Sequence, residues 1–266
     1  MTGSLACLAV VPTYLRTDED LDILLRCLVS LRQTAPQADV LVVDDCSPNT
    51  KLVDMLDLAA GELEIVLYRR PENGGFSRAV NDGLRWALKE GRDAVLVNAD
   101  IEFTRPHWLE AMLARKDTTG APAAVVGARL LYPNGLIQHG GVYYSTLHRF
   151  WAHRFNYGPA DLPEALVPCR CPVTGALQLI RHECLYAVGV YDESFRMGHE
   201  DVDYCLRVFA SGRECIYEPA ACAVHAESVF RRRKGEGQDD WERESARTLQ
   251  KKYATSDLSG FRPSYE

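Results

Sequence analysis

The sequence lacks any apolar run long enough to cross a membrane. A transmembrane helix needs about 18 or more consecutive apolar residues, and the 266-residue chain contains no such stretch. The first apolar run, Leu5–Pro12, is also not preceded by the basic region of a secretory leader. We therefore expect a soluble, cytoplasmic protein, with contact at the cytoplasmic face of a membrane as the alternative.

An excess of basic residues is missing too. The chain has 30 Lys and Arg against 37 Asp and Glu, which gives a net charge of -7. This balance argues against a nucleic-acid partner, because binding to DNA or RNA depends on basic surfaces. Any phosphate group must therefore be held by a few local side chains. The composition, 47% hydrophobic and 25% charged, is that of a globular protein with one large α/β domain or two small ones.

Two glycine-rich phosphate-binding signatures are missing as well. No GxGxxG motif follows the first apolar run, and neither GxxxxGKS nor GxxxxGKT occurs in the chain. A bound phosphate would therefore be held without a dinucleotide fingerprint and without a P-loop.

The nine cysteines are an odd number, and most of them lie among apolar neighbours. This favours reduced, buried thiols in a reducing compartment. Cys169 and Cys171 are the one close pair, with CxC spacing, and they lack a second pair or a His at zinc-finger distance. We expect them to occupy a loop or strand rather than to bind a metal.

Apolar periodicity alternates between strand and helix in the first half of the chain. The expected strands are 6–11, 39–44, 64–68 and 94–98, and the expected helices are 21–33, 51–58, 77–89 and 106–114. Such alternation predicts right-handed βαβ units and a mostly parallel sheet flanked by helices. The second half is less regular, with strands at 125–132, 140–144, 173–180 and 215–225, helices at 182–188 and 201–212, and a long loop at 151–168.

This organisation predicts one domain over residues 1–230. The resemblance described below implies that it is catalytic, with a nucleotide-binding half to about residue 115 and an acceptor-binding half over 116–230. Residues 231–266 are expected to form a charged loop and a C-terminal helix. The basic run Arg231–Lys234 opens this tail; it is expected to be solvated, with contact to a diphosphate or to an anionic membrane as the alternative.

The segment Leu96–Phe103 ends a buried strand with two carboxylates, Asp100 and Glu102. Ligands bind at the carboxyl ends of strands in open α/β sheets, so Asp100, two residues after Asn98, is well placed to hold a divalent cation against a phosphate. The alternative is that Asp100 ends the strand or caps the next helix. Polar segments follow three other strands: Pro12–Arg16, Asp44–Asn49 and Asn73–Gly83. Each alone could be a cap or a turn, but together they exceed what caps and turns require.

The segment GHEDVDYCLR crowds three carboxylates, Glu200, Asp201 and Asp203, into the first turn of an expected helix. Acidic residues there complement the helix dipole by about 0.3–1 kcal/mol each. Three carboxylates after the flexible Gly198 exceed that need. Crowding of like charges can raise one pKa toward the value of a general base.

Taken in order, these segments resemble the family 2 glycosyltransferases of the A-type nucleotide-diphospho-sugar transferase fold, with rhamnosyltransferase-like character, over about residues 6–227. VVPTYLR resembles the opening strand and nucleotide loop, and VVDDCSPN the loop whose Asp contacts uracil or thymine. NGGFSRAVNDG resembles the segment beside the nucleotide, although Val80 stands where many relatives have Arg. NADIEF resembles the DxD motif, with Asn98 in its first position, and GHEDVDYCLR resembles the motif that carries the catalytic base.

The resemblance implies a metal-dependent, inverting transferase that moves a sugar from a UDP- or dTDP-sugar donor to a hydroxyl of a glycan or glycolipid acceptor. It implies that Asp201 is the base, that Glu200 orients the acceptor, and that Asp100 and His225 bind Mn²⁺ or Mg²⁺. A lone His at a strand end is more often a surface or structural residue than a metal ligand, and that alternative stays open for His225. The implied donor-binding residues are Pro12, Thr13, Tyr14, Arg16, Asp44, Asp45, Asn73, Gly75, Arg78 and Asn98.

Two rival functions stay open, as do the donor sugar, the acceptor and the oligomeric state. A sugar-phosphate nucleotidyltransferase shares the sheet topology and a metal, but it should carry a Gly-rich basic loop after the first strand, which PTYLRTDED lacks. A non-catalytic sugar-nucleotide-binding module would not need both Asp100 and Asp201.

Overall fold

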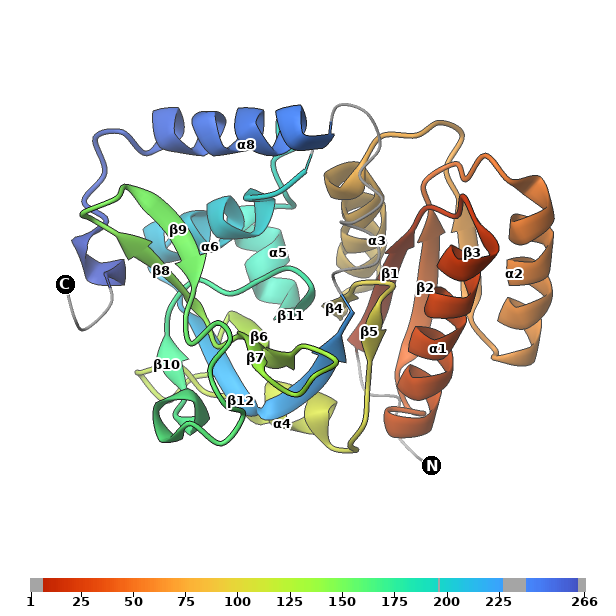
Figure 1. Ribbon diagram of the computed structural model, residues 1–266, viewed down its shortest axis with the longest axis horizontal. Helices are drawn as coiled ribbons and strands as arrows, with labels where there is room; N and C mark the ends of the chain where they lie inside the picture. Colours follow the sequence, from red (N-terminus) through yellow and green to blue (C-terminus); the bar gives the residue numbers. More distant parts are fainter. Residues whose placement is uncertain (1–6, 196, 227–237, 263–266) are drawn as a thin grey trace.

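Strands and helices alternate along the chain in the computed structural model, which describes residues 7–195, 197–226 and 238–262. The strands are β1 (Cys7–Thr13), β2 (Asp39–Asp44), β3 (Val66–Arg69), β4 (Asp93–Val97), β5 (Ile101–Glu102), β6 (Val125–Leu131), β7 (Ile137–His139), β8 (Val142–Ser145), β9 (Phe150–His153), β10 (Cys169–Arg170), β11 (Leu177–Ile180) and β12 (Cys215–His225). The helices are α1 (Asp18–Thr34), α2 (Thr50–Glu62), α3 (Phe76–Glu90), α4 (Trp108–Ala114), α5 (His182–Val188), α6 (Glu200–Ala210) and α8 (Gln238–Lys252), with 3-10 turns η1 (Pro163–Leu166) and η2 (Ser259–Phe261). Figure 1 shows their arrangement.

The strands form a ten-stranded sheet with the order β10-β12-β6-β11-β4-β1-β2-β3, to which β5 and β7 are added beside β12 and β6. Strands β3, β2, β1 and β4 run parallel, as the strand–helix alternation predicts. Beyond β4 the sheet is mixed, because β11 is antiparallel to both β4 and β6, whereas β12 is parallel to β6. The predicted α/β class, with a helix-flanked sheet, is confirmed.

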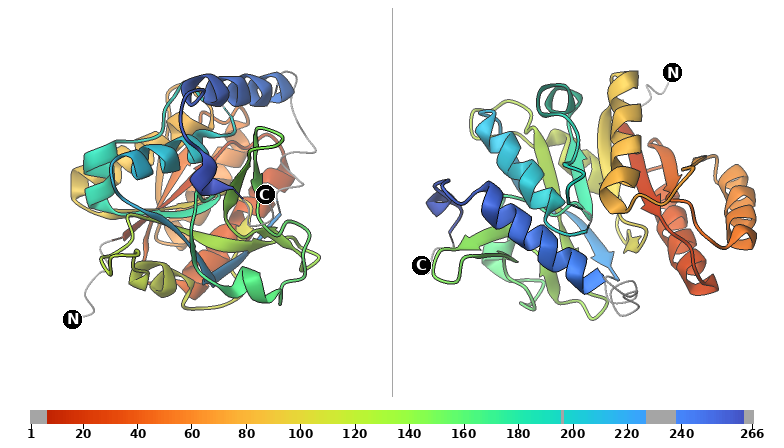
Figure 2. Two further views of the ribbon diagram at one scale, coloured as in Figure 1. Left: turned by 90° about the vertical axis from the view of Figure 1, so that its left-hand side faces the viewer. Right: turned by 90° about the horizontal axis from the view of Figure 1, so that it is seen from above.

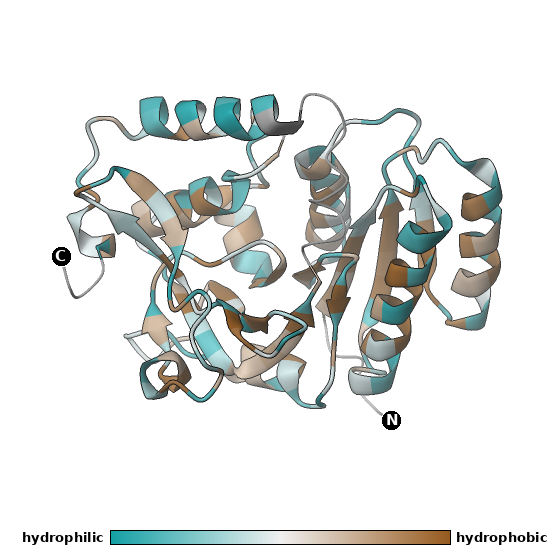
Figure 3. Cartoon of the chain, in the orientation of Figure 1, coloured by the Kyte–Doolittle hydropathy of each residue, from teal (hydrophilic) through white to brown (hydrophobic). Residues whose placement is uncertain are grey.

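Alternating side chains along the strands divide the core into two layers. In β1, Ala9 and Val11 face the layer of α1, α2 and α4, whereas Leu8 and Val10 face that of α3, α5 and α6. This period of two is what a strand buried on both faces requires. At Gly83 an added Cβ would lie 2.2 Å from a Val10 methyl carbon, so glycine lets α3 approach β1 closely. Figure 3 shows brown strands in the sheet and helices such as α1 that alternate between brown and teal along their turns.

The last helix, α8, packs across α6 (Figure 2). Leu249 is buried with Val202 and Leu206 of α6, and Lys252 Nζ lies 2.7 Å from carboxylate oxygens of Asp192 and Asp203. The basic run 231–234 lies outside the described residues. Within the described ranges no helix combines the length and the apolar character that a membrane crossing requires.

Two local expectations differ from the structure. The segment 151–168 is not one long loop, because it contains most of β9 and the turn η1; β9 pairs with β8, and the Tyr144 and Trp151 rings lie 5.0 Å apart at their centroids. Helix α1 begins three residues before the expected Leu21, because the side chains of Thr17 and Asp20 form a capping box at its start.

Candidate active site

Polar side chains gather at one edge of the sheet, where several strands end. β1, β2 and β4 are parallel, so their carboxyl ends meet at this edge. The antiparallel strand β11 starts there, and β12, which shares the direction of β4, ends there. The edge therefore brings together Thr13, Asp44, Asn98, Asp100 and His225, all of which the sequence predicted for the site.

Asp100 and His225 form a buried pair at this edge. Asp100 Oδ1 lies 3.0 Å from His225 Nε2, and each residue is 7% exposed. The other ring nitrogen, Nδ1, lies 2.6 Å from Gln138 Oε1. Because an amide oxygen only accepts, Nδ1 carries the proton and Nε2 turns a lone pair toward Asp100 in the neutral ring. Such a partner on the distal nitrogen is typical of a histidine that binds metal.

The Asp100–His225 pair fits a divalent cation. A lone pair and a carboxylate oxygen at 3.0 Å repel each other unless a proton or a cation lies between them. Among the described residues no group of three His, Cys, Asp or Glu side chains is arranged to hold a metal ion. Asp100 and His225 are therefore two candidate ligands, and a cation held by these two would keep coordination positions for a substrate and water.

Two buried oxygens beside this pair have no hydrogen-bond partner within the described part of the chain. They are Thr13 Oγ1, at the end of β1, and Asn98 Oδ1, just after β4. A buried polar atom without a partner costs about 1–3 kcal/mol, so such atoms are rare unless a ligand or water satisfies them. Their position on adjacent strands favours a bound polar group at this edge.

Asp201 is connected to the Asp100 segment through the backbone before β11. Its Oδ2 accepts the Gly175 N–H at 2.9 Å, and the next carbonyl, that of Ala176, accepts the Asn98 N–H at 2.8 Å. A Cβ on Gly175 would lie 2.8 Å from the Tyr191 hydroxyl, so the residue must be small there. The predicted base is half-buried, whereas the neighbouring Glu200 is buried.

Asp44 ends β2 and is fully buried. Its carboxylate accepts hydrogen bonds from the Ser47 backbone N–H at 3.1 Å and from the Ser47 hydroxyl, and its Oδ2 lies 3.3 Å from Arg69 Nε. These contacts fold the loop 45–49 back onto the strand end.

Asp45, the next residue, organises the loop before α3. Its Oδ1 accepts the Gly74 N–H at 2.9 Å and pairs with Arg70, and its Oδ2 accepts the Gly75 N–H at 2.8 Å and the Asn73 amide at 3.0 Å. Gly75 has a φ of 83°, a conformation that glycine adopts at no steric cost. All four acceptor positions of the carboxylate are therefore occupied by the protein.

Asp45→Ala should destabilise the protein by about 3 kcal/mol, because it leaves the buried Arg70 guanidinium with one carboxylate fewer and three N–H donors without their acceptor. Urea unfolding followed by circular dichroism measures this change. Asp39→Ala is the matched control, because Asp39 is 62% exposed in its 2.6 Å pair with Arg92 and should cost less than about 1 kcal/mol. Equal losses for the two variants would contradict the assignment.

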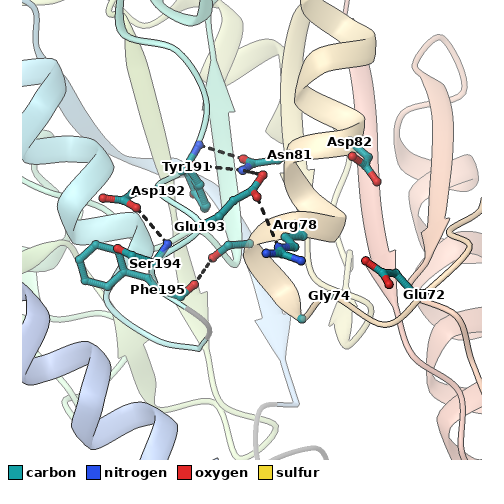
Figure 4. Close-up of polar contacts among 12 residues, drawn as sticks. Glu72, Gly74, Arg78, Asn81, Asp82, Tyr191, Asp192, Glu193, Ser194 and Phe195 are labelled. Atoms are coloured by element: carbon teal, nitrogen blue, oxygen red, sulfur yellow. Dashed lines mark hydrogen bonds and ion pairs between the residues drawn. The ribbon is translucent and has the colours of Figure 1, made fainter.

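Arg78 lies on the first turn of α3 and is 48% exposed. Its Nε is 3.4 Å from Glu193 Oε2, in the loop before α6 (Figure 4). Asn81 holds the same loop, donating to the Tyr191 carbonyl and accepting the Tyr191 N–H, both at 2.9 Å. Hydrogen bonds from Asn81 and Arg85 lower the pKa of Glu193, which keeps it anionic beside Arg78.

The remaining predicted residues lie around β1. Pro12 is buried in β1, at a position past the last residue pair between β1 and β4. Its missing N–H therefore costs no hydrogen bond to β4. Tyr14 is 36% exposed beside it. Arg16 is half-buried, and its Nε lies 3.7 Å from Asp20 Oδ2 in α1. Asn73 lies with Asp45, as described above.

The sequence did not assign five residues that the geometry links to this edge: Arg70, Gln138, Gly175, Asn81 and Tyr191. Gly175 lies in the expected strand 173–180 and Asn81 in the segment Asn73–Gly83, and the small size of one and the amide group of the other were the available signals. Gln138 contacts a residue 87 positions away, and Tyr191 is held through its backbone by Asn81, so neither side chain gave a local signal.

Comparison with known proteins places the chain in a family. Residues 8–174 match the family described as glycosyl transferase family 2, which is more than half of the chain. The O-antigen biosynthesis protein RfbC of Myxococcus xanthus is 31% identical over 224 residues, covering 79% of this chain and 17% of that protein. The chain thus spans less than a fifth of the length of this curated relative.

Two solved structures share the fold. A crystal structure of GalNAc-T7 with UDP, GalNAc and Mn²⁺ aligns with a TM-score of 0.66 and 18% identity over 85% of this chain and 44% of that chain. A mannosyltransferase of Pyrobaculum calidifontis in complex with GDP-Man and Mn²⁺ aligns with a TM-score of 0.60 and 17% identity over 98% of this chain and 67% of that chain.

Proposed function

The chain belongs to glycosyl transferase family 2, and from that membership we propose an inverting, metal-assisted transfer of a sugar from a UDP- or dTDP-sugar to a hydroxyl of a glycan or glycolipid. One observation carries the proposal: the Asp100–His225 pair and Asp201 lie on one connected piece of structure. A phosphate-binding group and a proton acceptor so connected suit the two ends of a transfer reaction.

A divalent cation at Asp100 and His225 would neutralise the negative charge that develops on the leaving diphosphate. Thr13 and Asn98 offer the unpartnered oxygens described above to the donor. The two solved relatives hold UDP or GDP-Man together with Mn²⁺, which supports metal-assisted donor binding.

Asp201 takes the proton of the attacking acceptor hydroxyl in this proposal. The Gly175 N–H fixes one carboxylate oxygen and the half-exposed side chain stays reachable for an acceptor. Glu200, buried beside it, orients the acceptor. Attack from this side, opposite the leaving diphosphate, gives inversion.

Asp44, rather than Asp45, is our assignment for the contact with the donor base. The Asp45 carboxylate is saturated by the loop 73–75 and Arg70. The buried Asp44 carboxylate is held by Ser47 and by the exposed Arg69, and a bound base would replace one of these contacts. A carboxylate accepts the N3–H of uracil or thymine. Guanine offers N1–H and N2–H on the corresponding edge, so the expected preference for a pyrimidine rests on the proposed UDP- or dTDP-sugar donor and not on this hydrogen bond alone.

UDP and dTDP should therefore bind at least tenfold more tightly than GDP. Isothermal titration calorimetry with each nucleotide in the presence of Mn²⁺ is the test, and hydrolysis of UDP- and dTDP-sugars is the activity readout. Tighter binding of GDP would overturn the assignment of Asp44 and of the pyrimidine donor together.

Gln138→Leu should weaken Mn²⁺-dependent binding of UDP by about 10–100-fold, because the distal nitrogen of His225 loses the partner that fixes its ring and its tautomer. Calorimetry at several Mn²⁺ concentrations measures this. Gln33→Leu, at an exposed position of α1, is the control. An unchanged Mn²⁺ dependence in Gln138→Leu would remove His225 from the metal site.

A further inference from the structure

Cys169 and Cys171 form a pair of thiols that the proposed transfer does not use. Their Sγ atoms lie 3.6 Å apart. Cys169 lies in β10, and the Cys171 N–H continues the pairing by donating to the Cys215 carbonyl at 3.2 Å. Residues i and i+2 of an extended segment point to the same face, which accounts for the contact.

The two thiols have different surroundings. Cys169 is half-buried with Arg154 Nη1 3.7 Å from its Sγ, whereas Cys171 is 3% exposed in the layer of α3, α5 and α6. The hydrogen bond from Cys171, together with the Arg154 charge, lowers the pKa of Cys169 to about 7. The same hydrogen bond and burial raise the pKa of Cys171 well above its ordinary value. In such pairs the accessible thiolate attacks and the buried thiol resolves.

We propose that Cys169 and Cys171 are a thiol–disulfide exchange site, which a low-molecular-weight disulfide such as oxidised glutathione converts into an intramolecular disulfide. The Cys169 thiolate attacks one sulfur of glutathione disulfide, which forms a mixed disulfide and releases one glutathione thiolate. Cys171 gives its proton to the released glutathione thiolate and attacks the Cys169 sulfur of the mixed disulfide, which releases the second glutathione as a thiolate. Two protein thiols are oxidised and one small disulfide is reduced, so no further oxidant is needed.

The position of β10 permits this closure. A disulfide requires an S–S distance of about 2.05 Å, shorter than the observed contact, so the two residues must move toward each other. β10 is two residues long and lies at the end of the strand order, where local distortion breaks few ladder hydrogen bonds. Gly141 leaves the space for the Cys171 sulfur, because a Cβ there would lie 2.5 Å from it.

Closure also affects the segment that holds Asp201. Gly175, whose N–H contacts Asp201, follows Cys171 by four residues, and the intervening Pro172 carbonyl is tied to the Val142 N–H at 2.8 Å. A displacement of Cys171 is therefore expected to move Gly175, whose N–H holds the Asp201 carboxylate. This step rests on the proposed function, and we expect oxidation to lower transfer several-fold and dithiothreitol to restore it.

The first test needs no activity. The intact protein is incubated anaerobically with glutathione disulfide and then alkylated, and tryptic peptides are analysed by mass spectrometry. Trypsin cleaves after Arg170, between the two cysteines, so a disulfide keeps two peptides joined. We expect that joined species to form before other thiols react, and faster as the pH rises toward about 7. A glutathione adduct that persists on Cys169, or reaction elsewhere first, would overturn the proposal.

Single variants separate the two roles. Cys171→Ser should trap a stable glutathione adduct on Cys169, and Cys169→Ser should leave Cys171 unmodified because it is buried. Cys222→Ser, which removes a half-buried thiol of β12 outside the pair, should form the disulfide as the wild type does. Adducts on Cys171 in Cys169→Ser would contradict the assignment. A disulfide that forms without change in transfer would refute the coupling to Asp201, whereas an enzyme inactive in both redox states would instead contradict the proposed function.

Discussion

Asp201→Asn should reduce sugar transfer by about 10²–10⁴-fold while leaving donor binding nearly unchanged. Asparagine keeps the size of the side chain and one oxygen, which can accept either the Gly175 N–H or the Val202 N–H that the two aspartate oxygens accept at 2.9 and 2.7 Å. It cannot take a proton, and the acceptor hydroxyl loses its base. Transfer rates with the donor saturating, together with calorimetry of UDP and Mn²⁺, measure the two effects separately.

Asp192→Asn is the matched control, because it removes a nearby carboxylate whose contact is with Lys252 at 2.7 Å. Its transfer rate should stay within a few-fold of the wild type. If Asp201→Asn also stays within a few-fold, Asp201 is only a carboxylate at a helix start. Glu200, Asp203 or water would then carry the proton.

Asp100→Ala should abolish the metal dependence of UDP binding and lower transfer by more than about 100-fold, beyond what losing an outer-shell partner costs. Without Asp100 the His225 ring is the one predicted ligand left at this edge, and the diphosphate faces an acidic protein without a cation. Calorimetry with UDP, with and without Mn²⁺, is the measurement.

Glu102→Ala is the control that removes a nearby carboxylate without removing the one beside His225. Glu102 lies two residues beyond Asp100 but is exposed on β5, so its loss should leave the Mn²⁺ dependence intact. Equal, metal-independent affinity in the wild type and Asp100→Ala would exclude Asp100 from the site. A loss of Mn²⁺ dependence in Glu102→Ala would instead assign the Glu102 carboxylate as a metal ligand.

The elements that the sequence predicted most accurately are those with strong local signals. The bounds of β2, α5 and β12 agree with the expected 39–44, 182–188 and 215–225, because each is an apolar or helix-forming run between clear breaks. The strands β9 and β10 have four and two residues, too few to show a period. β9 pairs with the preceding strand β8, whereas the partner of β10 is β12, which lies far along the chain and which no local pattern encodes.

The candidate site divides in the same way. Asp100 was predicted because it follows a recognisable buried strand, and the strand direction then brings it to the edge. The contact between Asp201 and Gly175 involves a backbone N–H, which every residue but proline possesses and which therefore carries no signature. The saturation of Asp45 also depends on how the loop 73–75 folds around it. The residue types predicted the kind of chemistry, but tertiary contacts decide which carboxylate oxygens already accept hydrogen bonds from the protein.

The insertion of β11 beside β4 implies that the first 115 residues cannot be isolated as a folded fragment. Cutting the chain near residue 115 would leave Ala94–Val97 without the antiparallel partner that covers it from Leu177 to Ile180. An apolar edge strand of this kind recruits other chains. A fragment of the first 115 residues should therefore form insoluble aggregates on expression, and supplying the remaining chain in trans should rescue its solubility.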